Sequence, residues 1–305
     1  MRVSVVICTY SESMFAHLQD AVESVLSQTY DDVEVIVIVD GNDSLCDRVN
    51  AEYGDTTNLE IHCNAENLGL SASRNNALAY VTGDIVAFLD DDAIADEEWI
   101  AELVSVYVDR DAIAVGGKMT PLWVAEKPVF LPQEFYWLIG VTHRGFAASG
   151  DEVRNTFGSN ISFRSEVLRE LEGFDTEIGR QGEKNLQSEE TLFCAQMRQA
   201  YGSGVIYNPD AKVAHKVFEY RTNKRWLLER AFWQGYSKRR METILPVTSG
   251  DEESEFLRQL VLESCPARLK SLVVEPRIAK FAQLIAMFVL TSAVGFGYLY
   301  GWLKS

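Results

Sequence analysis

Four short strand-like runs in the first ninety residues, most of them continuously apolar, constrain the fold of this chain more than any other feature. A continuous apolar run of four to eight residues is typical of a parallel strand buried on both faces. Helical spacing of apolar residues separates the runs, so the sequence predicts an α/β fold with a Rossmann-like, mostly parallel sheet flanked by helices. The runs are residues 3–10 (VSVVICTY), 33–40 (VEVIVIVD), 59–64 (LEIHCN) and 84–90 (DIVAFLD).

Three helices are predicted around these strands, at residues 14–28, at residues 69–81 and from Asp96 onward. Asp96 is a favourable N-cap because its carboxylate can accept a hydrogen bond from the first helical turn. Apolar residues recur on one side of each helix, as burial requires. The residues expected to be buried are Phe15, Leu18, Val22, Val25 and Leu26, then Leu78 and Val81, then Trp99, Leu103 and Val106.

Carboxylates directly follow two of the strands. Asp40 ends the second run, and the triplet Asp90, Asp91 and Asp92 ends the fourth. In open parallel sheets ligands bind beyond the carboxyl ends of the strands. A single aspartate such as Asp40 is often only a turn former, whereas Asp90 and Asp92 in DxD spacing can share Mg²⁺ or Mn²⁺, which would also neutralise a diphosphate. The alternative is an acidic loop in an acidic protein.

The chain is strongly acidic, with 45 Asp and Glu residues against 28 Lys and Arg and a net charge of -17. This balance fits either an ordinary soluble acidic protein or a halophile protein, because high salt screens self-repulsion. It disfavours nucleic acid as a partner, since phosphates bind Lys and Arg.

The cysteines indicate a reducing, cytosolic compartment. They are odd in number and lack CxxC spacing, so reduced thiols are expected rather than a zinc site or a disulfide framework. The N-terminus also lacks the pattern of a signal peptide. The cysteines are Cys8, Cys46, Cys63, Cys194 and Cys265.

Residues 281–303 carry no charge, and Gln283 is their one strongly polar side chain. As a helix this stretch is about 35 Å long, which is enough to cross a membrane. Basic residues precede it and only Lys304 follows, which places the upstream domain on the cytoplasmic side. The alternative is a buried hairpin helix of a soluble core.

Three domains follow from this organisation: a catalytic domain at 1–220, a helical, membrane-proximal segment at 221–280, and a transmembrane helix at 281–303. The basic helix at 222–242 either lies at the headgroup boundary or is an ordinary packed helix. The irregular segment at 118–149 is either an acceptor-side or membrane-facing loop or part of the core.

Six sequence blocks, in this order, resemble family 2 glycosyltransferases with the GT-A fold. The resemblance covers roughly residues 1–240 and implies transfer of a sugar from a UDP-sugar donor, with inversion at the anomeric carbon. The blocks are VSVVICTYSE, VIVIVDGNDS, NLGLSASRNNAL, GDIVAFLDDDA, GSNISFRSEVLRELEGFD and SEETLFCAQMRQ.

The resemblance also implies roles for residues at matching positions. Asp90 and Asp92 resemble the DxD pair that holds Mn²⁺ or Mg²⁺ against the diphosphate. His215 lies where some GT-A enzymes place a further metal or diphosphate contact, although a lone His is more often structural. The donor-binding positions are Thr9 and Glu12 beside the uracil–ribose pocket, Asp40 on the nucleoside, Arg74 as a basic contact and Asp91 on the ribose.

The acceptor hydroxyl needs a general base, because an alcohol is a poor nucleophile until its proton is removed. Family members commonly carry Glu-Asp where this chain has Glu189 and Glu190. Glu190 matches the base and Glu189 is the fallback, and the longer side chain leaves the assignment open. The alternative is a plain helix start, with Ser188 as N-cap and acidic residues favoured by the macrodipole.

A membrane anchor makes sense for an acceptor that is itself in the membrane, such as a polyprenyl or dolichyl phosphate. The whole chain is similar to haloarchaeal transferases that build dolichyl-phosphate-linked glycans for protein N-glycosylation of surface-layer proteins. The resemblance therefore implies transfer of a hexose or hexuronic acid, most specifically glucuronic acid. The alternatives are a membrane-tethered, non-catalytic nucleotide-sugar-binding scaffold and a phosphotransferase of the haloacid dehalogenase type, which carries DxD on its first strand.

Overall fold

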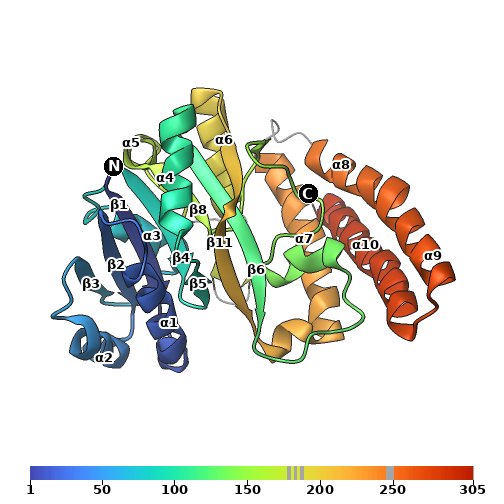
Figure 1. Cartoon of the computed structure of the whole chain (residues 1–305), viewed down its shortest axis with the longest axis horizontal. Coiled ribbons are helices and arrows are strands. Elements are labelled where there is room, and N and C mark those ends of the chain that lie inside the picture. Colours follow the sequence, from blue (N-terminus) through green and yellow to red (C-terminus); the bar gives the residue numbers. More distant parts are fainter. Residues whose placement is uncertain (177–179, 182–183, 186–188, 245–250, 305) are drawn as a thin grey trace. The chain divides into compact units, whose positions relative to one another are not determined.

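The computed structural model describes residues 1–176, 180–181, 184–185, 189–244 and 251–304 (Figure 1). The chain divides into two compact units. The first unit is Met1–Pro121 with Ala147–Lys216, and the second unit is Leu122–Phe146 with Val217–Ser305. Most of the irregular segment at 118–149 therefore belongs to the second unit, while the three-domain division stays a prediction.

A mixed sheet forms the centre of the first unit, and among the described residues it has nine strands in the order β3-β2-β1-β4-β8-β6-β11-β5, with β7 on β11. The strands are β1 Val3–Thr9, β2 Val33–Asp40, β3 Leu59–Asn64, β4 Ile85–Asp90, β5 Ala93–Ala95, β6 Ala114–Trp123, β7 Glu152–Val153, β8 Ile161–Arg164 and β11 Val205–Val217. A separate ribbon pairs β9 Arg180–Gln181 with β10 Lys184–Asn185.

The four predicted strands are confirmed as the parallel half of this sheet. β1 pairs in parallel with β2 and β4, and β2 pairs in parallel with β3. Nearly every residue of β1 and β2 is buried, as expected for strands covered on both faces. β8 then pairs antiparallel with β4 and β6, and β11 pairs antiparallel with β5 and β7. The sheet is Rossmann-like at one end and antiparallel at the other.

The helices of the first unit include the three that the sequence predicts, at α1, α3 and α4. The helical elements of this unit are η1 Glu12–Met14, α1 Phe15–Leu26, α2 Asp43–Tyr53, α3 Leu70–Ala77, α4 Trp99–Arg110, α5 Ser165–Glu170 and α6 Glu189–Tyr201. Those of the second unit are η2 Gln133–Ile139, η3 Glu219–Thr222, α7 Lys224–Ile244, α8 Asp251–Gln259, η4 Leu260–Ser264, α9 Cys265–Val274 and α10 Ile278–Lys304.

Some details of the predicted helices are wrong. Leu26 is 42% exposed, although its neighbour Val25 in the same last turn of α1 is buried. α3 ends at Ala77, so the buried Val81 lies beyond it. α4 begins at Trp99 rather than near Asp96, because β5 and a turn occupy the preceding residues, and the Asp96 carbonyl accepts the Trp99 N–H instead. Val106 is only partly buried.

The expectation that all cysteines are reduced is wrong for one pair. Cys46 of α2 and Cys63 of β3 form a disulfide, with their Cα atoms 6.2 Å apart. The two residues are 17 apart in sequence, and only the packing of α2 beside β3 brings them within reach, so their spacing gave no signal. Cys8, Cys194 and Cys265 are free thiols.

In the second unit the predicted apolar helix is confirmed as α10, which extends to Ile278–Lys304. By length and composition, this helix could cross a membrane. It lies along α7 (Figure 1). Leu227 and Ala231 of α7 share a buried apolar cluster with Met287 and Leu290 of α10.

Candidate functional site

The carboxyl ends of β1, β2 and β4 bring several predicted residues to one edge of the sheet. Because β1 lies between the other two strands, Thr9, Asp40 and Asp90 end three neighbouring strands. Thr9 Oγ1 donates a hydrogen bond to Asp91 Oδ2 at 2.6 Å. The structure therefore joins the end of β1 to the aspartate triplet that follows β4.

Asp90, Asp92 and His215 form a cluster that could hold a metal ion. Each offers one ligand atom, and these atoms lie within 4.8 Å of one another. His215 Nε2 is 3.3 Å from Asp92 Oδ1, because β11 runs antiparallel to β5 with His215 opposite Ala93. Two carboxylate oxygens and one imidazole nitrogen fit a divalent cation such as Mn²⁺ or Mg²⁺.

The middle carboxylate of the triplet has a raised pKa. Burial and, to a lesser extent, the charges of Asp92 and Asp90 raise the pKa of Asp91 to about 7. The hydrogen bond from Thr9 opposes it. Because like charges this close disfavour ionisation, a cation at Asp90 and Asp92 would relieve a repulsion that the fold itself creates.

Arg74 connects the triplet to the two candidate bases. Its side chain is fully buried, and Nη2 donates to Asp90 Oδ1 and to the Gly158 carbonyl, both at 3.1 Å. Nη1 donates to Glu190 Oε1 at 3.3 Å and lies 3.9 Å from Glu189 Oε1. One guanidinium therefore holds carboxylates from β4 and α6 beside each other.

Glu189 and Glu190 occupy the first turn of α6. The pKa of Glu190 is raised to about 7, because burial and the neighbouring Glu189 raise it more than Arg74 lowers it. A pKa near neutrality suits a general base. Ser188, the alternative N-cap, lies outside the described residues.

Asp40 is engaged by its own loop. Its carboxylate accepts hydrogen bonds from Leu68 N and Gly69 N, both at 2.9 Å, and from Asn64 Nδ2 at 2.8 Å. These contacts hold the turn that leads into α3, as expected if Asp40 is a turn former. The contact of Asp40 with the sugar-nucleotide donor stays a prediction. Glu12 Oε2 lies 3.5 Å from Arg48 Nη1 on the exposed surface, and its role also stays a prediction.

The sequence block GSN at residues 158–160 carries contacts that the sequence did not assign. Ser159 Oγ accepts a hydrogen bond from Asp90 N at 3.0 Å. The buried Asn160 accepts one from Trp99 Nε1 at 2.9 Å. Gly158 leaves room for the base candidate, because a Cβ there would lie 1.8 Å from Glu190 Oε1. The block was visible as part of the family pattern, but nothing local indicated these partners.

Gly158→Ala is expected to displace the Glu190 carboxylate and to lower the rate of sugar transfer about 10²-fold, the cost of a misplacement of about 1 Å. The fold should survive, because the nearest atoms that the methyl group meets are the ends of the Glu190 and Arg74 side chains. The measurements are initial rate and melting temperature. Gly295→Ala, where a Cβ meets nothing within 4 Å, is the control, and a Gly158→Ala rate within twofold of the control would contradict this prediction.

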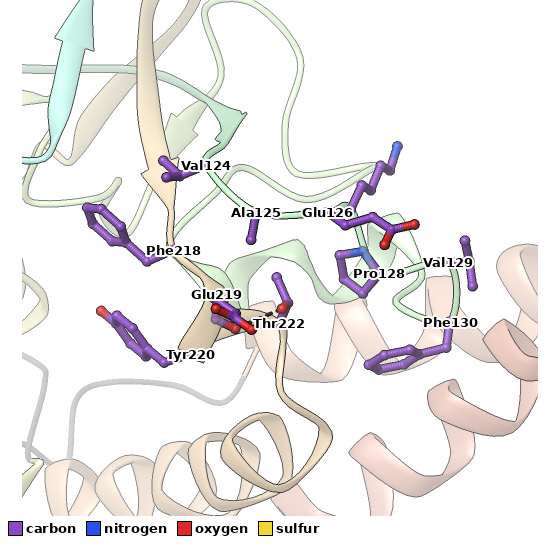
Figure 2. A pocket seen from close by; sticks show the side chains of 11 residues that line it. Val124, Ala125, Glu126, Pro128, Val129, Phe130, Phe218, Glu219, Tyr220 and Thr222 are labelled. Carbon is purple, nitrogen blue, oxygen red and sulfur yellow. Dashed lines mark hydrogen bonds between the residues drawn. The ribbon is translucent and has the colours of Figure 1, made fainter.

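The second unit contains a groove of about 860 Å³ between the residues after β6 and those around η3. Figure 2 shows Phe218 and Tyr220 on one side and Pro128 and Phe130 on the other. Most of its lining is apolar, and the residues are Val124, Ala125, Glu126, Lys127, Pro128, Val129, Phe130, Phe218, Glu219, Tyr220 and Thr222.

Family membership follows from comparison with known proteins. The family described as glycosyl transferase family 2 matches residues 4–172. The chain belongs to this family and is a glycosyltransferase, so the haloacid dehalogenase alternative is wrong. Its sequence is 50% identical, over 99% of this chain and 96% of the relative, to the glucosyl-dolichyl phosphate glucuronosyltransferase of Haloferax volcanii.

Solved structures confirm the GT-A fold. The mannosyltransferase PcManGT from Pyrobaculum calidifontis, in complex with GDP-Man and Mn²⁺, matches 98% of this chain and 87% of its own, with a TM-score of 0.59 and 18% identity. S. aureus TarS 1-349 in complex with UDP-GlcNAc matches 96% of this chain and 82% of its own, with a TM-score of 0.55 and 17% identity.

Proposed function

We propose that this glycosyltransferase moves glucuronic acid from UDP-glucuronate to a dolichyl-phosphate-linked acceptor, with inversion at the anomeric carbon. The observation that carries the proposal is the 50% identity, over nearly the whole chain, to a glucosyl-dolichyl phosphate glucuronosyltransferase. The acceptor is then glucosyl-dolichyl phosphate, and the product serves N-glycan or surface-layer glycoprotein biosynthesis.

The metal site proposed for this enzyme is Asp90, Asp92 and His215. These residues would hold Mn²⁺ or Mg²⁺, and the bound cation would neutralise charge on the departing diphosphate. Thr9 and Asp91, which hydrogen bond to each other, are proposed to line the donor site with Asp40, Glu12 and Arg74.

Glu190 is proposed as the general base and Glu189 as its fallback. The acceptor oxygen bonds to the anomeric carbon, the bond from that carbon to the diphosphate oxygen breaks, and UDP leaves with the bonding pair. The acceptor proton passes to the Glu190 carboxylate. The raised pKa of Glu190 supports this role, because a base of this strength can take a proton during attack.

The enzyme is proposed to act at the cell membrane with its catalytic unit facing the cytoplasm. An apolar helix at its C-terminal end and a relative named for a lipid-linked substrate support membrane association. If that helix crosses the membrane, the excess of basic residues before it supports the orientation.

The direct test is donor choice by the purified protein. With glucosyl-dolichyl phosphate as acceptor, we expect transfer from UDP-glucuronate and little from UDP-glucose or UDP-GlcNAc, detected by mass spectrometry of the lipid product. Cells lacking the protein should accumulate the unextended lipid. Faster transfer from another nucleotide sugar would mean that UDP-glucuronate is not the donor. An unchanged pool of lipid-linked saccharides in the cells lacking the protein would contradict the proposed acceptor.

Chelation and Asp92→Asn are both expected to abolish most activity. Loss of the cation removes several kcal/mol of charge stabilisation, which corresponds to about a 10²–10³-fold lower rate. Mn²⁺ should restore chelated wild type but not Asp92→Asn, and calorimetry should show weaker Mn²⁺ binding to the variant. The exposed Asp96 gives the control Asp96→Asn, with the same charge change. Full activity of Asp92→Asn would rule out this metal site.

A further inference from the structure

α10 has two different faces. Met287, Leu290, Gly297 and Gly301 are buried within the second unit. Exposed apolar side chains lie on the outside from Phe281 to Leu303, three or four residues apart except for the step of eight residues from Phe288 to Phe296. We call these residues the outer face: Phe281, Ile285, Phe288, Phe296, Leu299 and Leu303.

The inner face of α10 is built for close contact with α7. A Cβ at Gly297 would lie 1.8 Å from the Phe232 carbonyl oxygen, and one at Gly235 would lie 2.0 Å from the Val294 carbonyl oxygen. Tyr298 Oη donates a hydrogen bond to Glu242 Oε2 at 2.7 Å. The backbones of α7 and α10 are therefore in direct contact, and the hydrogen bond from Tyr298 to the charged Glu242 lies between the same two helices.

Gln283, the strongly polar residue of the apolar stretch, also makes hydrogen bonds within the second unit. Gln283 accepts a hydrogen bond from Arg268 of α9 at 2.6 Å and donates one to the Val129 carbonyl at 2.9 Å. Arg268 pairs in turn with the buried Glu134. Removing α10 from this position would break both hydrogen bonds of Gln283 and leave Arg268 without one of its partners.

α7 itself cannot enter hydrocarbon, because charged side chains recur from its first turn to its last. Charged groups within a bilayer are strongly disfavoured, so α10 could cross only by separating from α7. The charged residues of α7 are Lys224, Arg225, Glu229, Arg230, Lys238, Arg239, Arg240 and Glu242.

We propose that α10 does not cross the bilayer but lies in the plane of the membrane interface, with its outer face in lipid and its inner face on α7. A helix with one strongly apolar face and a packed opposite face suits this position. The proposal replaces the single crossing that the sequence predicts, and it holds whichever sugar is transferred.

Charge identifies the partner as an anionic lipid surface. The whole chain has a net charge of -17, yet α9 to α10, residues 265–304, carry one acidic residue, Glu275, and five basic ones. Arg268 is paired with Glu134, so the other four basic residues set against Glu275 leave this segment a net positive charge. Basic residues beside an inserted apolar face favour anionic headgroups. Val273 and Val274 at the end of α9 are exposed apolar residues as well. The basic residues are Arg268, Lys270, Arg277, Lys280 and Lys304.

The position of the C-terminus tests the proposal. An epitope tag after residue 305, in the full-length protein within sealed vesicles, should be cleaved by protease added on the side of the catalytic unit, without detergent. An N-terminal tag marks that side as control. A C-terminal tag protected until detergent is added would mean that α10 crosses, and would overturn the proposal.

Vesicle binding gives a second, independent test without any sugar donor. Phe288→Glu combined with Leu299→Glu should weaken binding to phosphatidylglycerol vesicles at least tenfold and leave the melting temperature unchanged, because both side chains are exposed. Val108→Glu, on exposed α4 surface, is the control. The proposal would be overturned if the double variant bound the vesicles as tightly as wild type. It would also be overturned if the wild-type protein self-associated and did not bind vesicles.

Discussion

Glu190→Gln is expected to lower kcat for sugar transfer by about 10²–10⁴-fold, the usual contribution of a general base. The amide keeps the size of the side chain and can still meet Arg74, which lies 3.3 Å from Glu190 Oε1. The fold and the KM for the donor should therefore change little. Steady-state kinetics with both substrates varied, together with a thermal melt, measure these effects.

Glu189→Gln is the matched control, because it removes the same charge one residue away. Glu189 is 5% exposed and lies farther from Arg74, at 3.9 Å, so its loss should cost less in kcat than the loss of Glu190. A larger loss of kcat in Glu189→Gln than in Glu190→Gln would assign the base to Glu189. Small losses in both variants would mean that neither residue is the general base.

The pH dependence of the wild type is expected to report the same group. Burial and Glu189 raise the pKa of Glu190 to about 7, and only the deprotonated carboxylate can accept a proton. The rate should therefore rise with pH through about 7 and level off above it. Initial rates from pH 5 to 9 test this. Because the pKa of Asp91 is also about 7, the assignment to Glu190 requires that Glu190→Gln lack the step. A wild-type rate that is flat over this range would argue against a Glu190 base.

The parallel half of the fold could be predicted because its signals are local. Continuous β-branched runs and helical spacing are properties of neighbouring residues, and they identified β1 to β4. The rule that ligands bind at the carboxyl ends of strands then placed Asp40 and Asp90 on one edge. Thr9 and Asp91, which the family resemblance named rather than any local pattern, hydrogen bond to each other at this edge.

The rest of the site depends on contacts between distant residues, and sequence spacing does not show these. Arg74 is 116 residues from Glu190, and His215 reaches Asp92 only because β11 pairs antiparallel with β5. The family pattern named these residues but not their partners. Gly158 had no local signal at all, because its importance is the space it leaves for Glu190.

Composition also could not decide how the C-terminal helix is used. Length and apolar content are the same for a crossing helix and for one that lies on a membrane. Gly297, which looks like any small residue in the sequence, distinguishes them in the structure because it brings α10 against the charged helix α7.

Arg74→Met is expected to lower the free energy of unfolding by about 3–5 kcal/mol, the cost of removing one partner of a buried ion pair. Asp90, Glu189 and Glu190 would then repel one another without a cation between them. Urea unfolding measures the loss, and Arg74→Lys should recover part of it, because an ammonium keeps the charge but not the planar donors.

The pH dependence of that loss separates charge from packing. Without Arg74 the carboxylates bind protons more readily in the folded protein, so their folded pKa values rise and the deficit should shrink as pH falls and grow as pH rises. Arg225→Met, which removes an exposed pair with Glu229, should cost within about 0.5 kcal/mol at every pH. If Arg74→Met cost no more than this control, Arg74 would not hold the carboxylates of β4 and α6 together. A large loss of unfolding free energy that did not vary with pH would mean that Arg74 holds Asp90 and Glu190 together through the packing of its long side chain and not through its charge.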